Sequence, residues 1–598
     1  MTTRLRIVAS LLAVTVVSTA HAQSNRFDAI APKGSALVLF ARNAKVVVDG
    51  IDASPIGRFF ASPELAPLVA PVQEESKKAQ SKQLREMGID ADSIPWPGPV
   101  GLAVFVEHNE ELDAPELGAL VWADYEDRAD EAAKVLDGLV RHLEKDSGRP
   151  FETVEVAGGL RATRIEFSED VPAGGGSDPQ PPRRGRPGGF DALAEFASVP
   201  EAAYIVRQGS QFFLATSVPV LEEAMAASAG QGGASIAGSD DYVGVMGLAG
   251  SPDIALVLIP EPLEKLAEPL FAGPMSSAKV VVSKLFGGIR ALALFGSVSE
   301  SDAPIAFGSA IFAPGVRTGV LELLTESSVI EPPLPALGER AVTYQRINVR
   351  FAKILELIEA VIAGLPDTEA DAIEGMIAPF QAGLQQGLSS LGPAVYSVTE
   401  PSRGDGTPAR SMTAMKCSNE KVANALLATM LPQAGMMPRD FKGQVVYGGD
   451  GMPIEFGLGG GAMLIGTPEA VEQGLRAAAD PGAKSLADDA VYQHCQKAIP
   501  DGPVCAWGYM DVATMLAEDL EARRKSETST RPEQDDGDLE AFGVAVPPLP
   551  YDGLFETALE KIDEPLIARY FGPVVWDVRE NARGLVMKGA WLRPRSPH

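Results

Sequence analysis

The sequence predicts an α+β protein made of two homologous halves, each an antiparallel sheet with helices packed on one face. Two observations lead to this prediction. Segments with a strand-and-helix pattern recur in the same order in both parts of the chain, and glycine-containing turns separate the paired strands. The halves cover residues 23–335 and 336–598, and the proline-rich stretch EPPLPALG (331–338) lies between them. Clustered prolines resist both helix and sheet, so we place the boundary there.

The clearest matched pair is YIVRQGSQFFLATSVPVLEEAMAAS, from Tyr204, and PIEFGLGGGAMLIGTPEAVEQGLRAAA, from Pro453. Each reads as strand, glycine turn, strand, threonine and helix. Thr216 and Thr467 can accept a backbone N–H at the helix start, and Pro468 suits the first helical position. The pattern predicts the same hairpin-and-helix unit in both halves.

A second matched pair contains His494 and Cys495. SIAGSDDYVGVMGLAG resembles SLADDAVYQHCQKAIP, with Ser235 on Ser485 and Tyr242 on Tyr492. Both read as an acidic turn followed by a short helix, a turn with proline and an apolar strand. Two segments break the pattern: residues 168–189, rich in Pro, Gly and charge, predict a disordered loop, and residues 523–540 predict a flexible one.

The N-terminus has the features of a secretory signal peptide over residues 1–22. Arg4 and Arg6 precede an apolar run that is too short to span a bilayer, and small residues lead to a cleavage site between Ala22 and Gln23. No later apolar stretch is long enough for a membrane span. We therefore expect an exported protein, periplasmic or extracellular.

The net charge of the chain limits the classes of partner that it can bind. The formal net charge is −29 over 598 residues. Such a charge favours solubility and repels nucleic acid and anionic membrane surfaces. We expect no nucleic-acid partner.

His494, Cys495 and Cys505 raise the question of a metal or redox site. In the matched stretch of the first half, His494 and Cys495 fall on Val245 and Met246, which are apolar, and Cys505 falls on an apolar position too. A buried cysteine behaves as a small hydrophobe, so we interpret these residues as structural. Whether Cys495 and Cys505 form a disulfide across the intervening turn stays open.

Searches for other chemistry give no catalytic, cofactor-binding or metal-binding residues. The histidines lack zinc-ligand spacing, and no nucleophile elbow or phosphate-binding motif is present. Asp488 and Asp489 resemble a catalytic carboxylate pair, but negative charge is also favoured where a helix begins, and we prefer that interpretation. We expect no cofactor.

The stretch APKGSALVLFARNAKVVVDGIDASPIGRFFASPELAPLV (31–69), with TSVPVLEEAM and SIAGSDDYVGVM further on, resembles a family of exported bacterial proteins of unknown function, of planctomycete type. The resemblance implies a two-repeat α+β fold and carries over no catalytic residue.

The sequence leads to three hypotheses for function. The first is an exported, non-enzymatic binding or scaffold protein whose partner is an unknown protein or an apolar ligand. The second is a carrier of an apolar or lipid-like ligand, held in a groove between sheet and helices. The third is a hydrolase with an unrecognised carboxylate site.

Overall fold

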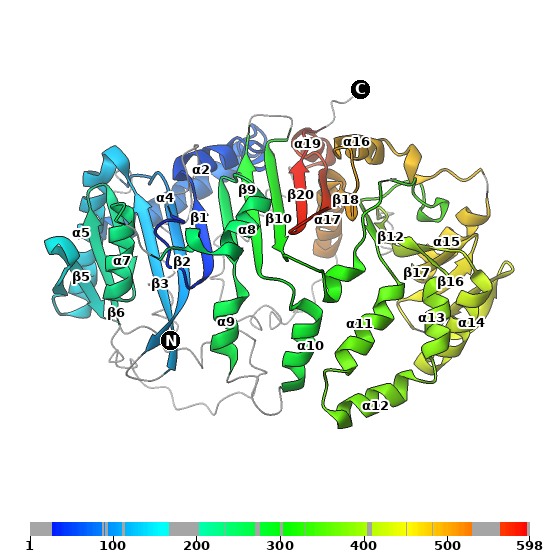
Figure 1. Ribbon diagram of the computed structural model, residues 1–598. Helices are drawn as coiled ribbons and strands as arrows, with labels where there is room; N and C mark the ends of the chain where they lie inside the picture. The colour runs from blue at the N-terminus through cyan, green and yellow to red at the C-terminus, as the bar shows by residue number, and fades with distance from the viewer. Residues whose placement is uncertain are drawn as a thin grey trace, which may run out of the picture.

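The protein is described by a computed structural model (Figure 1) over residues 27–86, 89, 94–109, 114–166, 202–231, 234–268, 276–299, 303–328, 330–402, 409–449, 451–480, 482–528 and 562–594. The predicted signal peptide, its cleavage site at Ala22 and Gln23, and the predicted loop 168–189 lie outside these residues. The predicted loop 523–540 begins within a helix that ends at Thr528, and its remainder also lies outside them.

Within these described residues the fold combines helices with one antiparallel sheet of 20 strands, so the α+β prediction is confirmed. The strands of the first half are β1 (Ser35–Ala41), β2 (Val100–Asn109), β3 (Ala114–Asp124), β4 (Glu152–Val156), β5 (Leu160–Glu166), β6 (Ala202–Gln208), β7 (Gln211–Ala215), β8 (Ile254–Leu258), β9 (Ala291–Val298) and β10 (Ile305–Phe312). Those of the second are β11 (Thr343–Asn348), β12 (Leu391–Thr399), β13 (Ser411–Cys417), β14 (Met437–Phe441), β15 (Gln444–Gly448), β16 (Glu455–Gly459), β17 (Ala462–Gly466), β18 (Ala506–Met510), β19 (Val574–Asn581) and β20 (Gly584–Trp591).

The helices of the first half are α2 (Ala44–Asp52), α3 (Pro55–Phe60), α4 (Ala66–Glu86), α5 (Ala129–Ser147), α7 (Val218–Ser228), α8 (Asp240–Ala249), α9 (Pro260–Ala267) and α10 (Ser276–Phe286). Those of the second are α11 (Ala352–Ile362), α12 (Asp367–Ile377), α13 (Gln381–Ser389), α14 (Glu420–Met430), α15 (Pro468–Ala479), α16 (Ala490–Ala498), α17 (Val512–Thr528) and α19 (Glu564–Tyr570). None of these helices is both long enough and apolar enough to cross a membrane.

Strand order is the same in the two halves when it is read outward from the centre of the sheet. The first half runs β10-β9-β8-β1-β2-β3-β7-β6-β5-β4. The second runs β20-β19-β18-β11-β12-β13-β17-β16-β15-β14. The order changes from the first series to the second between Phe312 and Thr343, an interval that contains the predicted boundary at Pro335.

Two separate sheets were expected, and the structure corrects this. β10 and β20 pair along their whole length, from Ile305 with Trp591 to Phe312 with Gly584, and join the halves into one sheet (Figure 1). Each would otherwise be an edge strand with unpaired N–H and C=O groups, and their pairing removes both edges at once.

Helices on one face of each sheet were also expected, and this too is wrong. On β16, an added Cβ at Gly457 would meet Val471 of α15, whereas the next residue, Leu458, packs in a cluster with Leu427 of α14. Successive strand residues point to opposite faces, so helices cover both. We call the face covered by α7, α8, α15 and α16 the front face and the opposite one the back face. Apolar and polar residues do not alternate along a strand that is buried on both faces, so the sequence pattern did not indicate the second layer of helices.

Candidate functional site

A pocket of about 530 Å³ lies on the back face of the second half, over β11, β12 and β13. Its volume is within the range of about 300–1,000 Å³ that ligand sites occupy. On these strands Tyr344, Val398 and Met412 belong to the front-face core, so the residues that alternate with them face the back. The lining residues are Thr343, Tyr344, Gln345, Ser397, Val398, Thr399, Ser411, Met412, Thr413, Pro453, Ile454, Ile465, Gly466, Thr467, Tyr509, Met510 and Trp576.

The back face changes chemistry along its strands at the point where helices stop covering it. Val395 on β12 and Met415 on β13 pair with each other and pack in the cluster that contains α14. Two residues further along, the paired positions are Ser397 and Thr413, which line the pocket. The strand therefore presents apolar side chains to the helix and hydroxyls to the pocket.

Strand register arranges the polar side chains in two rows across the sheet. The first row is Trp576–Gly508–Gln345–Ser397–Thr413–Ile465, and the second is Met510–Thr343–Thr399–Ser411. The hydroxyls of Ser397 and Thr413 lie 3.1 Å apart, those of Thr399 and Ser411 lie 3.3 Å apart, and in each pair either oxygen can donate. The floor of the pocket is thus a small array of linked hydroxyls.

Trp576 forms one wall of the pocket because its neighbour on β18 is a glycine. A Cβ on Gly508 would lie 2.6 Å from Cζ2 of Trp576 and 2.5 Å from the carbonyl oxygen of Tyr344. The indole ring therefore lies over the glycine, beside the first hydroxyl row. Ile454 and Ile465 form apolar parts of the lining.

The pocket has no charged side chain among its lining residues. The only titratable residues of the lining are Tyr344 and Tyr509, whose phenols belong to the front-face core and not to the pocket, and burial, the largest cause, raises the pKa of each above its ordinary value. Both stay neutral at physiological pH. The arrangement can donate and accept hydrogen bonds and can offer apolar surface, but supplies no group that exchanges a proton near neutrality.

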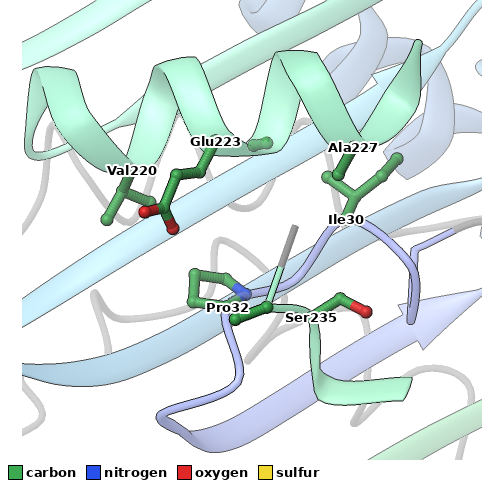
Figure 2. Close-up of a pocket in the computed structure, with 8 residues that line it drawn as sticks. Ile30, Pro32, Val220, Glu223, Ala227 and Ser235 are labelled. Atoms are coloured by element: carbon green, nitrogen blue, oxygen red, sulfur yellow. The ribbon is translucent and has the colours of Figure 1, made fainter. Parts of the chain in front are cut away.

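Figure 2 shows a second, much smaller void, between α7 and the segment around Pro32. Val220, Glu223 and Ala227 line it from the helix, and Ile30 and Ser235 lie opposite. Its volume of about 10 Å³ is close to the minimum that one water molecule needs. It is too small for a ligand.

The residues that raised the question of a metal or redox site lie apart from the pocket. Cys495 is buried in the front-face core of the second half, while Cys505 packs in a separate cluster with Leu321 and Leu585. The structure contains both as thiols, and His494 is half-buried on α16. This favours the alternative without a disulfide.

The burial pattern of α16 follows that of α8. Tyr492 and Cys495 on α16 have the same spacing as the buried Tyr242 and Val245 on α8. The correspondence places Cys495 on Val245, one residue from the match expected in the sequence, and both positions are apolar parts of the core.

Of the two aspartates before α16, Asp489 caps that helix and Asp488 belongs to the capping box of the short 3-10 helix Leu486–Asp488. The carboxylate of Asp489 accepts the N–H groups of Val491 and Tyr492, at 2.6 and 3.2 Å. Asp488 accepts the N–H of Ser485 as part of a capping box. The structural interpretation of this pair is confirmed.

One cluster was missed by the sequence analysis. Glu326, Cys505 and Glu580 bring one potential ligand atom each within 4.8 Å of one another. Burial, and then the two carboxylates, raise the pKa of the Cys505 thiol to about 11, so the thiol is protonated at neutral pH. Glu580 pairs with Arg317 at 2.9 Å, and Glu326 accepts the N–H of Glu580 at 2.8 Å. These carboxylates already have partners, and a thiol binds a metal ion only after losing its proton.

The hydroxyl rows were also missed, although the sequence contains a signal. Polar residues occupy every second position in TYQ (343–345), SVT (397–399) and SMT (411–413). This alternation indicates a site only when the strand register places the three segments side by side.

The comparisons with known proteins give little beyond this geometry. No family model matches the chain, and no curated protein matches it. Among solved structures, crystal form III of TP0453 is similar at a TM-score of 0.23 and 10% identity, over 46% of this chain and 84% of that one. Crystal form I gives a TM-score of 0.22 at 10% identity, over 46% and 83%. The resemblance to exported bacterial proteins stays a prediction.

Proposed function

We propose that this is an exported, non-enzymatic binding protein that holds a neutral ligand in the back-face pocket of its second half. One observation carries the proposal: none of the residues that line the pocket is charged, in a chain whose net charge is −29. A cationic ligand would be drawn to the acidic surface elsewhere, and an anionic one would find no cation in the pocket. A neutral ligand is the class that this lining suits.

The same lining favours binding over the hydrolase hypothesis. Hydrolysis by paired carboxylates needs titratable groups within hydrogen-bond reach of the reacting atoms. The only titratable residues of the lining are Tyr344 and Tyr509, whose phenols lie in the front-face core, where burial keeps them protonated. Nothing in the lining can serve as a general base at neutral pH.

The lining also separates this proposal from the apolar carrier. The hydroxyls of Ser397 and Thr413, like those of Thr399 and Ser411, are hydrogen-bonded to each other, and a lipid-like chain lying over them would offer no acceptor to the second hydrogen of each pair. Leaving a buried polar group without a partner costs about 1–3 kcal/mol. A ligand or partner segment with uncharged polar groups avoids that cost.

We further propose that the two halves descend from one duplicated unit. The shared strand order supports this, as does the recurrence of Tyr242 as Tyr492 and of Thr216 as Thr467. A crystal structure of the protein is the test: matched strands should have matched neighbours in both halves. A different order in either half would contradict the duplication.

Export is proposed from the N-terminal sequence. N-terminal sequencing of material secreted by the native host should begin at Gln23, after cleavage at Ala22. A chain that retains Met1 would contradict export through a cleaved signal peptide.

Binding is tested by native mass spectrometry of protein purified from its own host, compared with a pocket-blocking variant. Ser411 is exposed at the pocket rim, so Ser411→Trp places an indole there without disturbing the core. The matched control is Thr153→Trp, at an exposed strand position on β4 in the other half. We expect a bound neutral species in the native protein and the control but not in Ser411→Trp. If the blocked variant retains every bound species, the pocket is not the site.

A further inference from the structure

We infer that the ligand of the back-face pocket is a neutral glycan, with one sugar ring stacked on Trp576 and the next ones hydrogen-bonded to the hydroxyl rows. The inference rests on the proposed function, because it names the class of ligand for that same pocket. It draws on three features: the hydroxyl pairs, the position of Trp576 and the pairing of the strands beneath.

The hydroxyl pairs suit a ligand that both donates and accepts. Each Ser or Thr hydroxyl has one donor hydrogen and two acceptor lone pairs. Between Ser397 and Thr413, 3.1 Å apart, one hydrogen joins the pair and the other remains available to a ligand. Thr399 and Ser411 form the same arrangement at 3.3 Å. A sugar hydroxyl is also both donor and acceptor, so it matches either orientation of each pair.

Trp576 adds an apolar platform at the end of the first row. The faces of a sugar ring carry C–H groups while its rim carries hydroxyls, so an indole face beside a row of hydroxyls matches both surfaces. Adjacent strands lie about 4.8 Å apart, and Trp576 is two strands from Gln345 and three from Ser397. Because the indole ring lies over Gly508, it is one strand from Gln345 and two from Ser397, or roughly 5–10 Å. A glycan of more than one sugar spans the larger of these distances.

The pairing of the strands argues against a peptide ligand. Extended peptides bind sheets chiefly by adding a strand to a free edge, where main-chain groups are available. β12 lies between β11 and β13, and β13 lies between β12 and β17. The pocket floor is therefore the interior of a sheet and offers only side chains. Charged glycans are excluded as the preferred ligand because no lining residue is a cation.

The test is an array of neutral and acidic oligosaccharides probed with the full mature chain, followed by calorimetric titration of the strongest binder. We expect neutral oligosaccharides to bind and Trp576→Ala to weaken binding at least tenfold. Trp576→Phe, which keeps an aromatic face, should give an intermediate affinity. Thr413→Val keeps the shape and removes the hydroxyl, and should weaken binding about three- to tenfold.

The matched control is Leu294→Ala. Leu294 pairs with Leu256 on β8 as Trp576 pairs with Gly508 on β18, and it is 58% exposed, so affinity should not change. Melting curves establish that each variant is folded.

Three results would overturn the inference: an array without neutral-glycan binding, binding confined to acidic glycans, or neutral-glycan affinity that Trp576→Ala and Trp576→Phe leave unchanged. The proposed function fails separately, when Ser411→Trp retains every species bound in the host. A neutral species that Ser411→Trp loses, in a protein that binds no neutral glycan, would leave the pocket as the site and overturn only the ligand class.

Discussion

The back faces of the two halves carry opposite chemistry on the same strand order. In the second half the long row reads Trp576–Gly508–Gln345–Ser397–Thr413–Ile465. The strand pairing of the first half gives the corresponding row as Leu294–Leu256–Leu39–Leu102–Val121–Leu214. A row that is aliphatic throughout in one half is polar at its centre in the other.

The comparison teaches that the fold does not require the hydroxyls. The first half forms the same ladder with leucine and valine, and α9 contacts its strands β1, β2 and β3. The presence of hydroxyls in the second half is better explained by what the pocket contacts.

The front-face cores of the two halves differ in the positions of their large aromatic rings. Tyr344, Trp507 and Tyr509 pack together in the second half, with ring centroids of Tyr344 and Trp507 4.9 Å apart. The strand positions that match Trp507 and Tyr509 carry Ala255 and Val257 in the first half. The first half buries its own large rings on other strands, among them Phe105 on β2 and Trp122 on β3, so the two cores differ in where their rings lie.

The largest effect we expect is on the aromatic core. Trp507 is fully buried, so Trp507→Ala leaves a cavity and should lower the free energy of unfolding by about 3–5 kcal/mol. Leu294→Ala, on the exposed row of the first half, should change it by about 0.5 kcal/mol or less. Denaturant titration measures both. Equal effects would mean that Trp507 is not packed in the core as we describe.

Next in size is Gly508→Ala. The added Cβ would lie 2.5 Å from the carbonyl oxygen of Tyr344 and 2.6 Å from the Trp576 ring, so the ring must move. We expect a loss of about 1–3 kcal/mol in stability together with weaker ligand binding. The matched residue Leu256 already carries a side chain, and Leu256→Ala should leave binding unchanged. Binding that survives Gly508→Ala would show that the position of the Trp576 ring is unimportant.

The sequence predicted the local part of this fold. Hairpins such as β6–β7 and β16–β17 are continuous in sequence, and Gly209, Gly460 and Gly461 have the positive φ that marked their turns.

The role of Asp488 and Asp489 at a helix start was also predicted, because it involves neighbours in the chain. The caps expected from Thr216 and Thr467 are wrong: the Thr216 hydroxyl accepts the N–H of Ala119 on β3, and the Thr467 side chain makes no cap hydrogen bond.

What the sequence did not predict depends on distant pairing. β10 and β20 join residues more than 270 positions apart, and no local pattern specifies that contact. The pocket likewise depends on β11, β12 and β13 lying side by side, although long segments separate the first two. Alternating hydroxyls in a single strand indicate only an exposed face, and three adjacent strands are needed to make a site of it.

Converting the polar row to the aliphatic one tests the comparison directly. On β2 of the first half, Leu102 and Val104 occupy the positions that match Ser397 and Thr399, so the double variant is Ser397→Leu with Thr399→Val. We expect a folded protein, with stability changed by about 1 kcal/mol, and a loss of ligand affinity of at least tenfold. Melting curves and titration measure the two quantities. An unfolded variant would show that the second half needs its hydroxyls for structure.

A smaller effect is expected at high pH. Burial, the largest cause, raises the pKa of Tyr492 to about 12, while a tyrosine in the unfolded chain ionises near 10. The stability contributed by the neutral phenol is fully present below pH 10 and is lost as pH rises from 10 to about 12. Tyr492→Phe should flatten this part of the curve of unfolding free energy against pH. A variant with the same alkaline slope as the native protein would contradict the assignment to Tyr492.

The smallest effect is expected at Cys495. The side chain is fully buried on α16, and Val245 occupies the corresponding place on α8, also fully buried. Because a similar core already accommodates valine there, Cys495→Val should change the free energy of unfolding by about 1 kcal/mol or less. Reductant should not shift the melting temperature of the native protein, and alkylation after unfolding without reductant should label three thiols, since Cys417, Cys495 and Cys505 are all thiols in the structure. Labelling of a single thiol, with a melting temperature that falls on reduction, would establish the disulfide between Cys495 and Cys505 and would mean that the second half is cross-linked where the first is not.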